Sequence, residues 1–245
     1  GLYREYVMIS INTNYGSMFA SKAAGAAQKT MNSAMEKLSS GLRINNAKDD
    51  AAGQGIATRL TAEITSLNMA SRNASDAQAM IDTAEAAHQE VHAILLRMRE
   101  IAVQASNGTL SDSDRTALDA EVTELETEIS SIADNTKFAG INLGTGEAVK
   151  FQIGTAEGNV LNHTFVDFDV SSIGANIAVN SVSTATAALA TIDGAISTVS
   201  ANRGTLGALS NRLSSTIANL DNISVNLSSA RGRIQDTDFA EETSN

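Results

Sequence analysis

The sequence predicts a mainly α fold: an elongated antiparallel bundle of long helices that forms a coiled-coil-like rod, with a small β-hairpin region at its distal tip. Apolar residues recur at alternating steps of three and four over most of the 245 residues, the pattern of helices that each bury one narrow stripe. The chain has no proline to interrupt a helix, and aromatic residues make up only 4% of it. Its smaller apolar residues suit thin helix–helix seams better than a thick core.

The first predicted helix falls within residues 8–38 and is weakly amphipathic. It leads into a polar joint, residues 39–55, inside the stretch LSSGLRINNAKDDAAGQGIA. Basic residues, adjacent acids, amides and glycines occur together there, which is more polar detail than a simple connection between helices needs.

The sharpest helical pattern follows, over residues 56–104. At about 1.5 Å of rise per residue, this helix is on the order of 60 Å long, more than a compact domain uses. Its predicted seam residues are Ile64, Leu67, Ala74, Ala77, Ile81, Ala84, His88, Val91, Leu95, Met98 and Ala102.

A third helix is predicted over residues 111–135, and Ser111 with Asp114 resembles a capping box at its start. The apolar period then changes to two within residues 137–170, which predicts a β-hairpin. Its strands are expected around residues 149–153 and 166–170, joined by the turn GTAEGN.

Residues 171–185 are small and polar, and we expect a linker there before a last long helix over residues 186–235. Long helices from opposite ends of the chain then bury seams against each other, so both termini are expected at one end of the rod. Such a shape suits a subunit of an assembly.

The composition argues against several classes of protein. A net charge of −11 disfavours nucleic-acid binding, which needs a basic stripe. The absence of cysteine excludes disulfides. No uninterrupted apolar run approaches the roughly 18 residues of a membrane span, and the first residues lack the apolar run of a cleavable signal peptide.

Candidate catalytic and metal sites are weak. His88 and His92 lie one helical turn apart, but Gln89 stands where the zinc-protease motif needs glutamate, so seam or surface histidines are the default. Asp49 and Asp50 could suggest acid–base chemistry, yet adjacent acids in a joint usually form salt bridges. We expect no enzyme, no cofactor and no metal.

Several stretches together resemble bacterial flagellin, the subunit of the flagellar filament. The resemblance covers roughly residues 8–145 and 185–245. It rests on INTN (11–14), the joint stretch (38–57), RMREIAVQASNGT (97–109), FAGINLG (138–144) and RGTLGALSNRLSSTIANLDNISVNLSSARGRIQDTDFAEET (203–243).

The resemblance implies a domain organisation. Residues 8–38 correspond to the amino-terminal helix of the inner tube, 39–55 to the connecting joint, 56–235 to the rod domain and 236–245 to the start of a truncated carboxy-terminal inner-tube segment. Residues 1–7 resemble a non-family extension. The protein resembles a short flagellin that lacks large variable outer domains.

The resemblance also implies that the joint packs between neighbouring subunits. The charges and turn-forming residues there suit local or intersubunit contacts, and we hypothesise that the joint meets residues 230–242, with Arg43 and Asp236 as one pair to test by charge reversal. The candidate interface residues are Leu38, Gly41, Leu42, Arg43, Asn45, Lys48, Asp49, Asp50, Gly53, Arg231, Arg233, Asp236 and Asp238.

Further partners follow from the family alone. They are other flagellin subunits, the flagellar export apparatus and its chaperone, and the hook-associated junction and cap proteins. An animal innate immune receptor reads the rod of many flagellins, and Arg97, Ile101 and Glu121 are the candidate contacts here, although subunit contact is the stronger reading of these surfaces.

The function implied is a structural subunit that self-assembles into the flagellar filament for motility, located outside the cell and exported without a cleavable signal peptide. The alternative is a flagellin homologue at the cell surface that acts as an adhesin or ligand receptor. A hook–filament junction protein shares the terminal motifs, but the length of the match favours flagellin.

Overall fold

The computed structural model describes residues 14–244, so the predicted extension and the first residues of the predicted amino-terminal helix lie outside the described residues. The chain forms two compact units. Unit 1 takes its residues from the two ends of the sequence, up to Ile64 and from Val225 onward; unit 2 is the continuous segment Thr65–Ser224. Helices α2 (Ala51–Ala105) and α4 (Val182–Gln235) contribute residues to both units.

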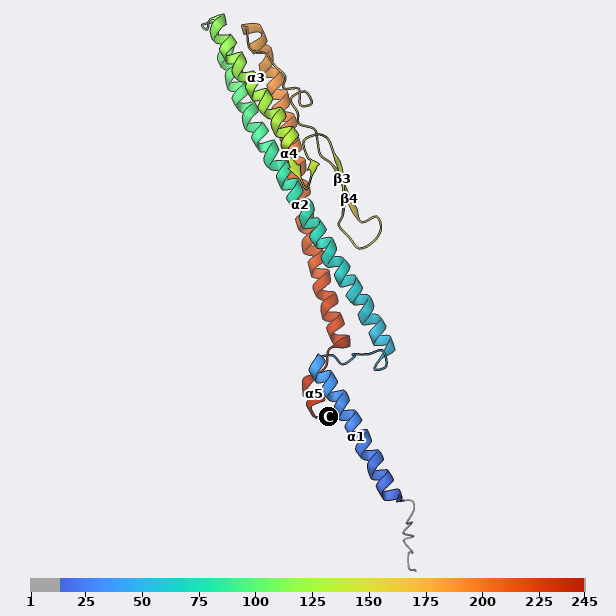
Figure 1. Ribbon diagram of the computed structural model, residues 1–245. Helices are drawn as coiled ribbons and strands as arrows, with labels where there is room; N and C mark the ends of the chain where they lie inside the picture. The colour runs from blue at the N-terminus through green and yellow to red at the C-terminus, as the bar shows by residue number, and fades with distance from the viewer. Residues whose placement is uncertain (1–13, 245) are drawn as a thin grey trace, which may run out of the picture. The chain divides into compact units, whose positions relative to one another are not determined.

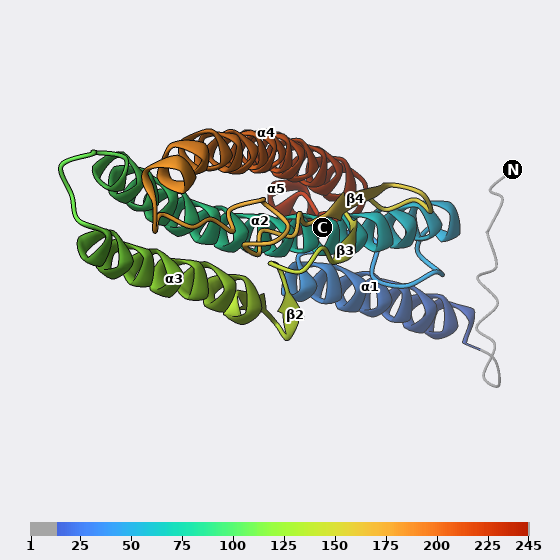
Figure 2. The ribbon, with the colours of Figure 1, turned by 90° about the horizontal axis from the view of Figure 1, so that it is seen from above.

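Unit 2 is a bundle of long helices in which α3 (Asp112–Asn135) and α4 lie alongside α2 (Figures 1 and 2). The predicted seam of α2 is confirmed, because each of its eleven residues from Ile64 to Ala102 is at most 7% exposed. On α4, Ile192, Val199 and Leu213 are buried in the same way. The 3/4 spacing therefore identified a continuous part of the buried stripe of the longest helix. The stripe is wider than predicted, because α2 also buries Ala57, Ala70, Met80, Ala87, Ile101 and Ala105.

The start of α3 is the predicted capping box. The Ser111 hydroxyl accepts a hydrogen bond from the Asp114 backbone N–H at 3.2 Å, and the Asp114 carboxylate accepts one from the Ser111 N–H at 3.2 Å. A 2.6 Å bond from the Ser111 hydroxyl to the Asp114 carboxylate, followed by the bond from the Ser111 N–H, lowers the pKa of Asp114. Two amides at the helix start are thus satisfied reciprocally.

Replacing Ser111 by alanine is expected to lower the free energy of unfolding of unit 2 by about 0.5–2 kcal/mol, since the Asp114 amide loses its acceptor. Urea unfolding followed by circular dichroism measures this loss. Ser113→Ala is the control, because Ser113 is an exposed neighbour in the same helical turn and its change should stay within about 0.5 kcal/mol. Equal losses in the two variants would contradict the capping role.

The β-hairpin has a different second strand from the one predicted. Strand β3 (Ala148–Gln152) pairs antiparallel with β4 (Val160–Thr164), from Ala148 opposite Thr164 to Gln152 opposite Val160. The strand predicted over residues 166–170 is wrong: those residues are irregular, and Phe168 and Val170 enter the helix-bundle core as part of a loop. Burial in a loop produced the apolar spacing that resembled a strand. A second, shorter ladder joins β1 (Lys137–Phe138) to β2 (Ile141–Asn142).

The hairpin lies along the flank of α2 and α4, not at the tip of the bundle as predicted (Figure 1). Leu161 and Phe165 pack in one cluster with Ile81 of α2 and Leu206 and Leu213 of α4. The tip of the bundle is formed instead by the turn between α2 and α3 and by the beginning of α4 (Figure 1). The period of apolar residues identifies which face of the hairpin is buried. It does not identify the position along the helix bundle at which that face packs.

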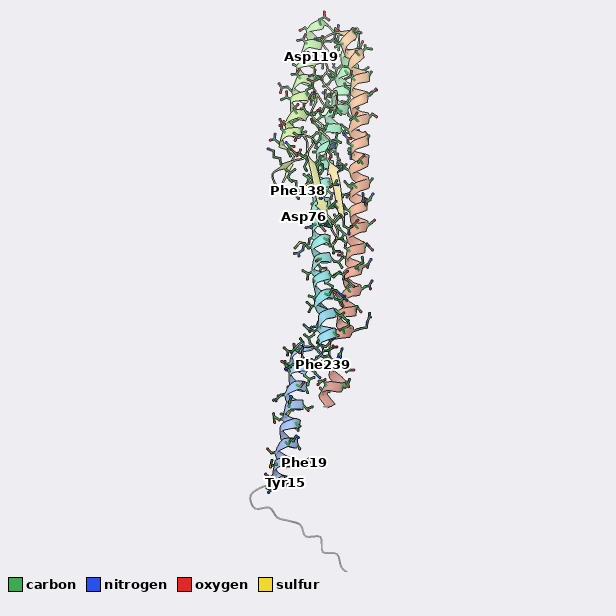
Figure 3. All side chains as sticks on the ribbon, turned by 90° about the vertical axis from the view of Figure 1, so that its right-hand side faces the viewer. Tyr15, Phe19, Asp76, Asp119, Phe138 and Phe239 are labelled. Carbon is green, nitrogen blue, oxygen red and sulfur yellow. The ribbon has the colours of Figure 1, made fainter. Side chains whose placement is uncertain are left out.

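The predicted linker is an ordered strap rather than a loose connection. Ile173, Ala175 and Val179 are buried in the core of unit 2. Two carboxylates of α3 hold its backbone: Glu126 accepts from the Ile177 N–H and Asp119 from the Val179 N–H, both at 2.7 Å. Figure 3 labels Asp119 on this helix. Burial raises the pKa of Glu126. Helix α4 then begins at Val182, four residues before the predicted start.

Helix α4 also contains an 18-residue window with a mean hydropathy of 1.2, of which 28% is buried. By length and composition this is the one helix in residues 14–244 that could cross a membrane, although polar residues interrupt its apolar ones. Core helices satisfy the same criteria, and α4 buries residues such as Ile192 and Val199 within unit 2.

Candidate functional site in unit 1

The joint pairs with the carboxy-terminal segment of the same chain. The Arg43 N–H donates to the Gln235 carbonyl at 2.7 Å, and the Thr237 N–H donates to the Gly41 carbonyl at 3.0 Å. An isolated antiparallel bridge joins Leu42 and Asp236 between these two bonds. The joint and residues 230–242 therefore do meet, as hypothesised from the sequence, and they meet through backbone hydrogen bonds.

The hypothesised ion pair between Arg43 and Asp236 is not formed within the chain. The Arg43 guanidinium donates to the Ile234 carbonyl at 2.6 Å, and no ion pair between Arg43 and Asp236 occurs in the described part of the chain. The ion pair that does join the two ends is Lys37–Glu242, at 3.3 Å, between α1 (Tyr15–Ser40) and α5 (Phe239–Ser244). Both of its side chains are at least partly buried, so solvent screens it less than a surface pair.

The two adjacent acids of the joint bind backbone amides rather than basic side chains. Asp49 accepts from the N–H groups of Asn45 and Asn46 at 3.2 and 2.9 Å. The bond from Asn46 is the main cause that lowers the pKa of Asp49. Asp50 accepts from the Gly53 N–H at 2.9 Å and so caps the start of α2. Local ion pairs of these acids with Arg43 or Lys48 are therefore not formed in the described part of the chain, and pairing between subunits stays a prediction.

The joint is built around one apolar residue, Ile44, which is 1% exposed. Gly53 allows this packing, because a Cβ at position 53 would meet the Asp50 carboxylate and lie 2.6 Å from Ile44 Cδ1. Gly41 ends α1 in the left-handed region, with φ of 74°, and its N–H donates to the Lys37 carbonyl. Each of these glycines has its own steric reason.

Gly53→Ala is expected to weaken the start of α2 although alanine is the better helix former. The added methyl group displaces the Asp50 cap or Ile44, so protection of the amide of residue 53 from hydrogen exchange should fall roughly tenfold, for about 1.4 kcal/mol. Gly55→Ala is the matched control, since a Cβ there meets nothing within 4 Å. Unchanged protection in Gly53→Ala would show that the joint tolerates the methyl group.

The remaining predicted joint residues have local roles. Arg231 donates to the Thr61 hydroxyl at 3.2 Å, and Arg233 donates to the Ser229 hydroxyl at 3.4 Å. Asp238 accepts from the Ala240 N–H at 2.9 Å, at the start of α5. Leu38 is half-buried and Lys48 is exposed.

Helix α1 carries an apolar patch that nothing in the described residues covers. Tyr15 is 76% exposed, Met18 60% and Phe19 76%. Figure 3 shows Tyr15 and Phe19 near the beginning of the helix. Met31 and Met35, further along, are 46% and 57% exposed. Grouped large apolar side chains on a surface mark a site of interaction, and the joint prediction did not include them.

The candidate receptor contacts in unit 2 are of two kinds. The Arg97 guanidinium donates to the Glu121 carboxylate at 2.8 Å, and this ion pair between α2 and α3 is exposed. Ile101 is only 1% exposed, so its inclusion as a surface contact is wrong. Ile101 lies on the side of α2 that faces the core. Its position three residues after the seam residue Met98 could have predicted this burial from the sequence.

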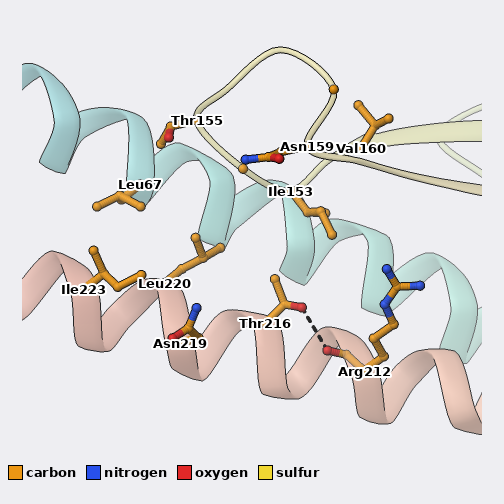
Figure 4. Close-up of a pocket in the computed structure, with 12 residues that line it drawn as sticks. Leu67, Ile153, Thr155, Asn159, Val160, Arg212, Thr216, Asn219, Leu220 and Ile223 are labelled. Atoms are coloured by element: carbon orange, nitrogen blue, oxygen red, sulfur yellow. Dashed lines mark hydrogen bonds between the residues drawn. The ribbon is translucent and has the colours of Figure 1, made fainter.

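A hollow of about 440 Å³ lies beside the hairpin turn in unit 2. Figure 4 shows Thr155 and Asn159 of the turn above α2 and α4, with Leu67, Leu220 and Ile223 on the helices below. The sequence identified the turn but gave no indication of this hollow, because the register of a hairpin along a helix pair depends on tertiary packing.

The histidine pair on α2 does not form one site. His88 is buried, and its Nδ1 lies 2.8 Å from the Ala84 carbonyl, whereas His92 is partly exposed. Within residues 14–244, no three side chains among His, Asp and Glu cluster in a way that could hold a metal ion.

Together, the long-helix bundle and the uncovered apolar patch define a subunit of an assembly. Residues 11–148 match the bacterial flagellin N-terminal helical region, and residues 189–245 match the bacterial flagellin C-terminal helical region. The chain belongs to the bacterial flagellin family. Because this family is structural, the expectation that the protein is not an enzyme is confirmed.

Individual relatives agree with the family match. A flagellin of Halalkalibacterium halodurans is 44% identical over 237 residues, covering 95% of this chain and 87% of that relative. Flagellin 1 of Proteus mirabilis is 43% identical over 166 residues, covering 67% of this chain but 46% of the relative. The chain thus resembles a short form of flagellin, without the large outer domain expected of longer members.

Two solved structures share the fold. The crystal structure of Bacillus cereus flagellin has a TM-score of 0.57 at 32% identity, over 61% of this chain and 88% of that chain. A putative flagellar hook-associated protein from Vibrio parahaemolyticus has a TM-score of 0.66, over 77% of this chain and 100% of that one. At 16% identity the second similarity shows the fold alone.

Proposed function

We propose that this chain is a structural subunit that self-assembles into the bacterial flagellar filament, outside the cell, and so serves motility. Flagellin family regions at both ends of the sequence and the 44% identical relative support this function. No observation on the described residues favours the alternative of a surface adhesin.

The apolar patch of α1 is the observation that carries the proposal. Tyr15, Met18 and Phe19 lie within about one helical turn, each at least 60% exposed, in a chain of net charge −11. Leaving such side chains in water costs free energy that burial recovers, at roughly 25 cal/mol per Å² of apolar surface. Neighbouring chains in the filament supply the cover.

In the proposed filament, each segment of the chain has its own structural role, as in the domain organisation that the family implies. Residues 8–38 and 236–245 belong to the inner tube, 39–55 form the joint and 56–235 form the rod. Backbone pairing of Arg43 with Gln235 ties the outgoing and returning segments within one subunit. A joint fixed in this way sets the direction of α1 after the joint. Because every subunit in the filament has the same joint, neighbouring subunits align in the same register.

Further partners belong to the same proposal. The subunit is exported through the flagellum's own secretion channel with the help of the export apparatus and a chaperone, and it contacts the hook-associated junction and cap proteins. A chain without cysteine or proline has neither disulfide exchange nor slow prolyl isomerisation to delay refolding at the tip. Arg97 and Glu121, being exposed, remain the candidate contacts for an animal innate immune receptor.

Negative-stain electron microscopy tests the assembly function. The chain is incubated with short filament seeds of the Halalkalibacterium halodurans flagellin, and seed length is followed with time. The seeds are expected to grow. An epitope tag on this chain, recognised by a gold-labelled antibody, shows that the new filament contains it. Seeds that never lengthen at any salt concentration, while the chain stays folded, would sink the proposal.

A further inference from the structure

A small cavity lies in unit 2 where α2, β4 and α4 meet, with a volume of about 270 Å³. Its polar wall includes His88 of α2, His163 of β4 and Asn202 of α4. Phe165, Val166 and Leu206 supply an apolar wall. The cavity is thus lined by polar atoms on some sides and hydrocarbon on others, as ligand sites commonly are.

His88 presents a hydrogen-bond acceptor at this cavity. Its side chain is 1% exposed, and its Nδ1 lies 2.8 Å from the Ala84 carbonyl, which can only accept, so Nδ1 carries the proton. Burial lowers the pKa of His88, which keeps the ring neutral and leaves a lone pair on Nε2. That Nε2 is buried and has no hydrogen-bond partner among the described residues.

Asn202 presents a donor at the same cavity. Its Nδ2 is buried, and no acceptor for it exists in the described part of the chain. The Nε2 of His163 is buried and lacks a partner in residues 14–244 as well. Buried polar atoms without partners cost about 1–3 kcal/mol each, so a native structure rarely keeps three around one cavity without a use.

We propose that this cavity is a binding site for a small neutral molecule that carries a hydroxyl group on an apolar body, as a phenol does. One hydroxyl group satisfies two of the three unpartnered atoms: its proton is donated to His88 Nε2, and its oxygen accepts from Asn202 Nδ2. The apolar body lies against Phe165, Val166 and Leu206. A volume just below that of drug-sized pockets limits the ligand to a single small ring or a short chain.

A transition-metal ion is the competing occupant, because two imidazoles reach the cavity. A cation would leave the Asn202 N–H without an acceptor. The nearby carboxylate of Glu85 offers a cation little net charge, because it is already paired with Arg203 at 2.7 Å. Cavity walls without a carboxylate among the described residues give a dication no charge compensation. The hydroxyl compound therefore fits the wall better.

Side-chain NMR of the ¹⁵N-labelled protein, titrated with phenol and with toluene, tests the proposal. Phenol is expected to shift the Nε2 resonance of His88 and the side-chain amide of Asn202. Toluene has the same ring without the hydroxyl group, and it should bind roughly three- to a hundredfold more weakly, the worth of one or two neutral hydrogen bonds.

Three variants and one further titration complete the test. His88→Phe should abolish the preference for phenol, and Asn202→Ala should reduce it in a second variant that keeps His88. His92→Phe is the matched control, because His92 lies one turn along α2 and does not line the cavity. Equal binding of phenol and toluene, a preference that survives both cavity variants, or no binding of phenol overturns the proposal. Zn²⁺ that shifts His88 and His163 where phenol does not would assign the cavity to a metal instead.

Discussion

Replacing Gly144 by alanine is expected to destabilise unit 2 by about 3 kcal/mol or more. A Cβ at this position would meet the Ala133 carbonyl oxygen and would lie 2.7 Å from Ala133 Cα and 2.8 Å from its carbonyl carbon. These are backbone atoms of α3, so no side-chain rotation relieves the clash. Either the end of α3 or the segment after β2 must move.

The movement would break several bonds at once. The Gly144 N–H donates to the Asn142 side chain at 2.8 Å, and the Gly144 carbonyl accepts from the Phe168 N–H at 3.3 Å. Phe168 is fully buried and its ring packs on His88, with ring centroids 4.5 Å apart. Displacing Gly144 therefore disturbs the turn, the loop and the core together.

Urea unfolding measures this effect through the midpoint. Gly194→Ala is the control, because a Cβ at position 194 of α4 meets nothing within 4 Å. That control should be neutral or stabilising by up to about 1 kcal/mol. A Gly144→Ala protein within about 0.5 kcal/mol of the parent chain would show that α3 is not held against this turn.

Phe19→Glu is expected to abolish incorporation of the chain into filaments while leaving unit 2 folded. Phe19 is 76% exposed in the isolated chain, so the substitution costs little before assembly. In an assembled apolar contact, a buried carboxylate without a partner costs several kcal/mol, which at 1.4 kcal/mol per decade reduces binding by more than a hundredfold.

Seed-elongation rates measured by light scattering test this loss. Ala24→Glu introduces the same charge on α1 about 140° around the helix from Phe19, so it serves as the control. We expect Ala24→Glu to retain more of the elongation rate than Phe19→Glu, with circular dichroism unchanged in both. Equal elongation by Phe19→Glu and the parent chain would remove the apolar patch from the assembly contact.

The sequence predicted the helices well because their burial follows a local period. The seam from Ile64 to Ala102 and the capping box at Ser111 were both confirmed. The second hairpin strand was missed because Val160–Thr164 contains only one buried hydrophobic residue, Leu161, whereas the more apolar residues 166–170 enter the core as a loop. Strand pairing is set by partners distant in sequence, which periodicity cannot identify.

The joint was located from its composition, but its bonds were not. Adjacent charges suggested ion pairs, yet Asp49 and Asp50 satisfy backbone amides, and Arg43 caps a carbonyl. Short acidic side chains beside a helix start bind amides because those donors have no helical partner. That rule would have predicted the role of Asp50 from the sequence alone.

Helical reconstruction by electron cryomicroscopy of filaments grown from this chain tests the central claim most directly. The account predicts that Tyr15, Met18 and Phe19 are buried against neighbouring chains, while the Arg43–Gln235 backbone bond persists within each subunit. A filament in which the apolar patch of α1 faces solvent, or in which the joint has separated from residues 235–237, would contradict it.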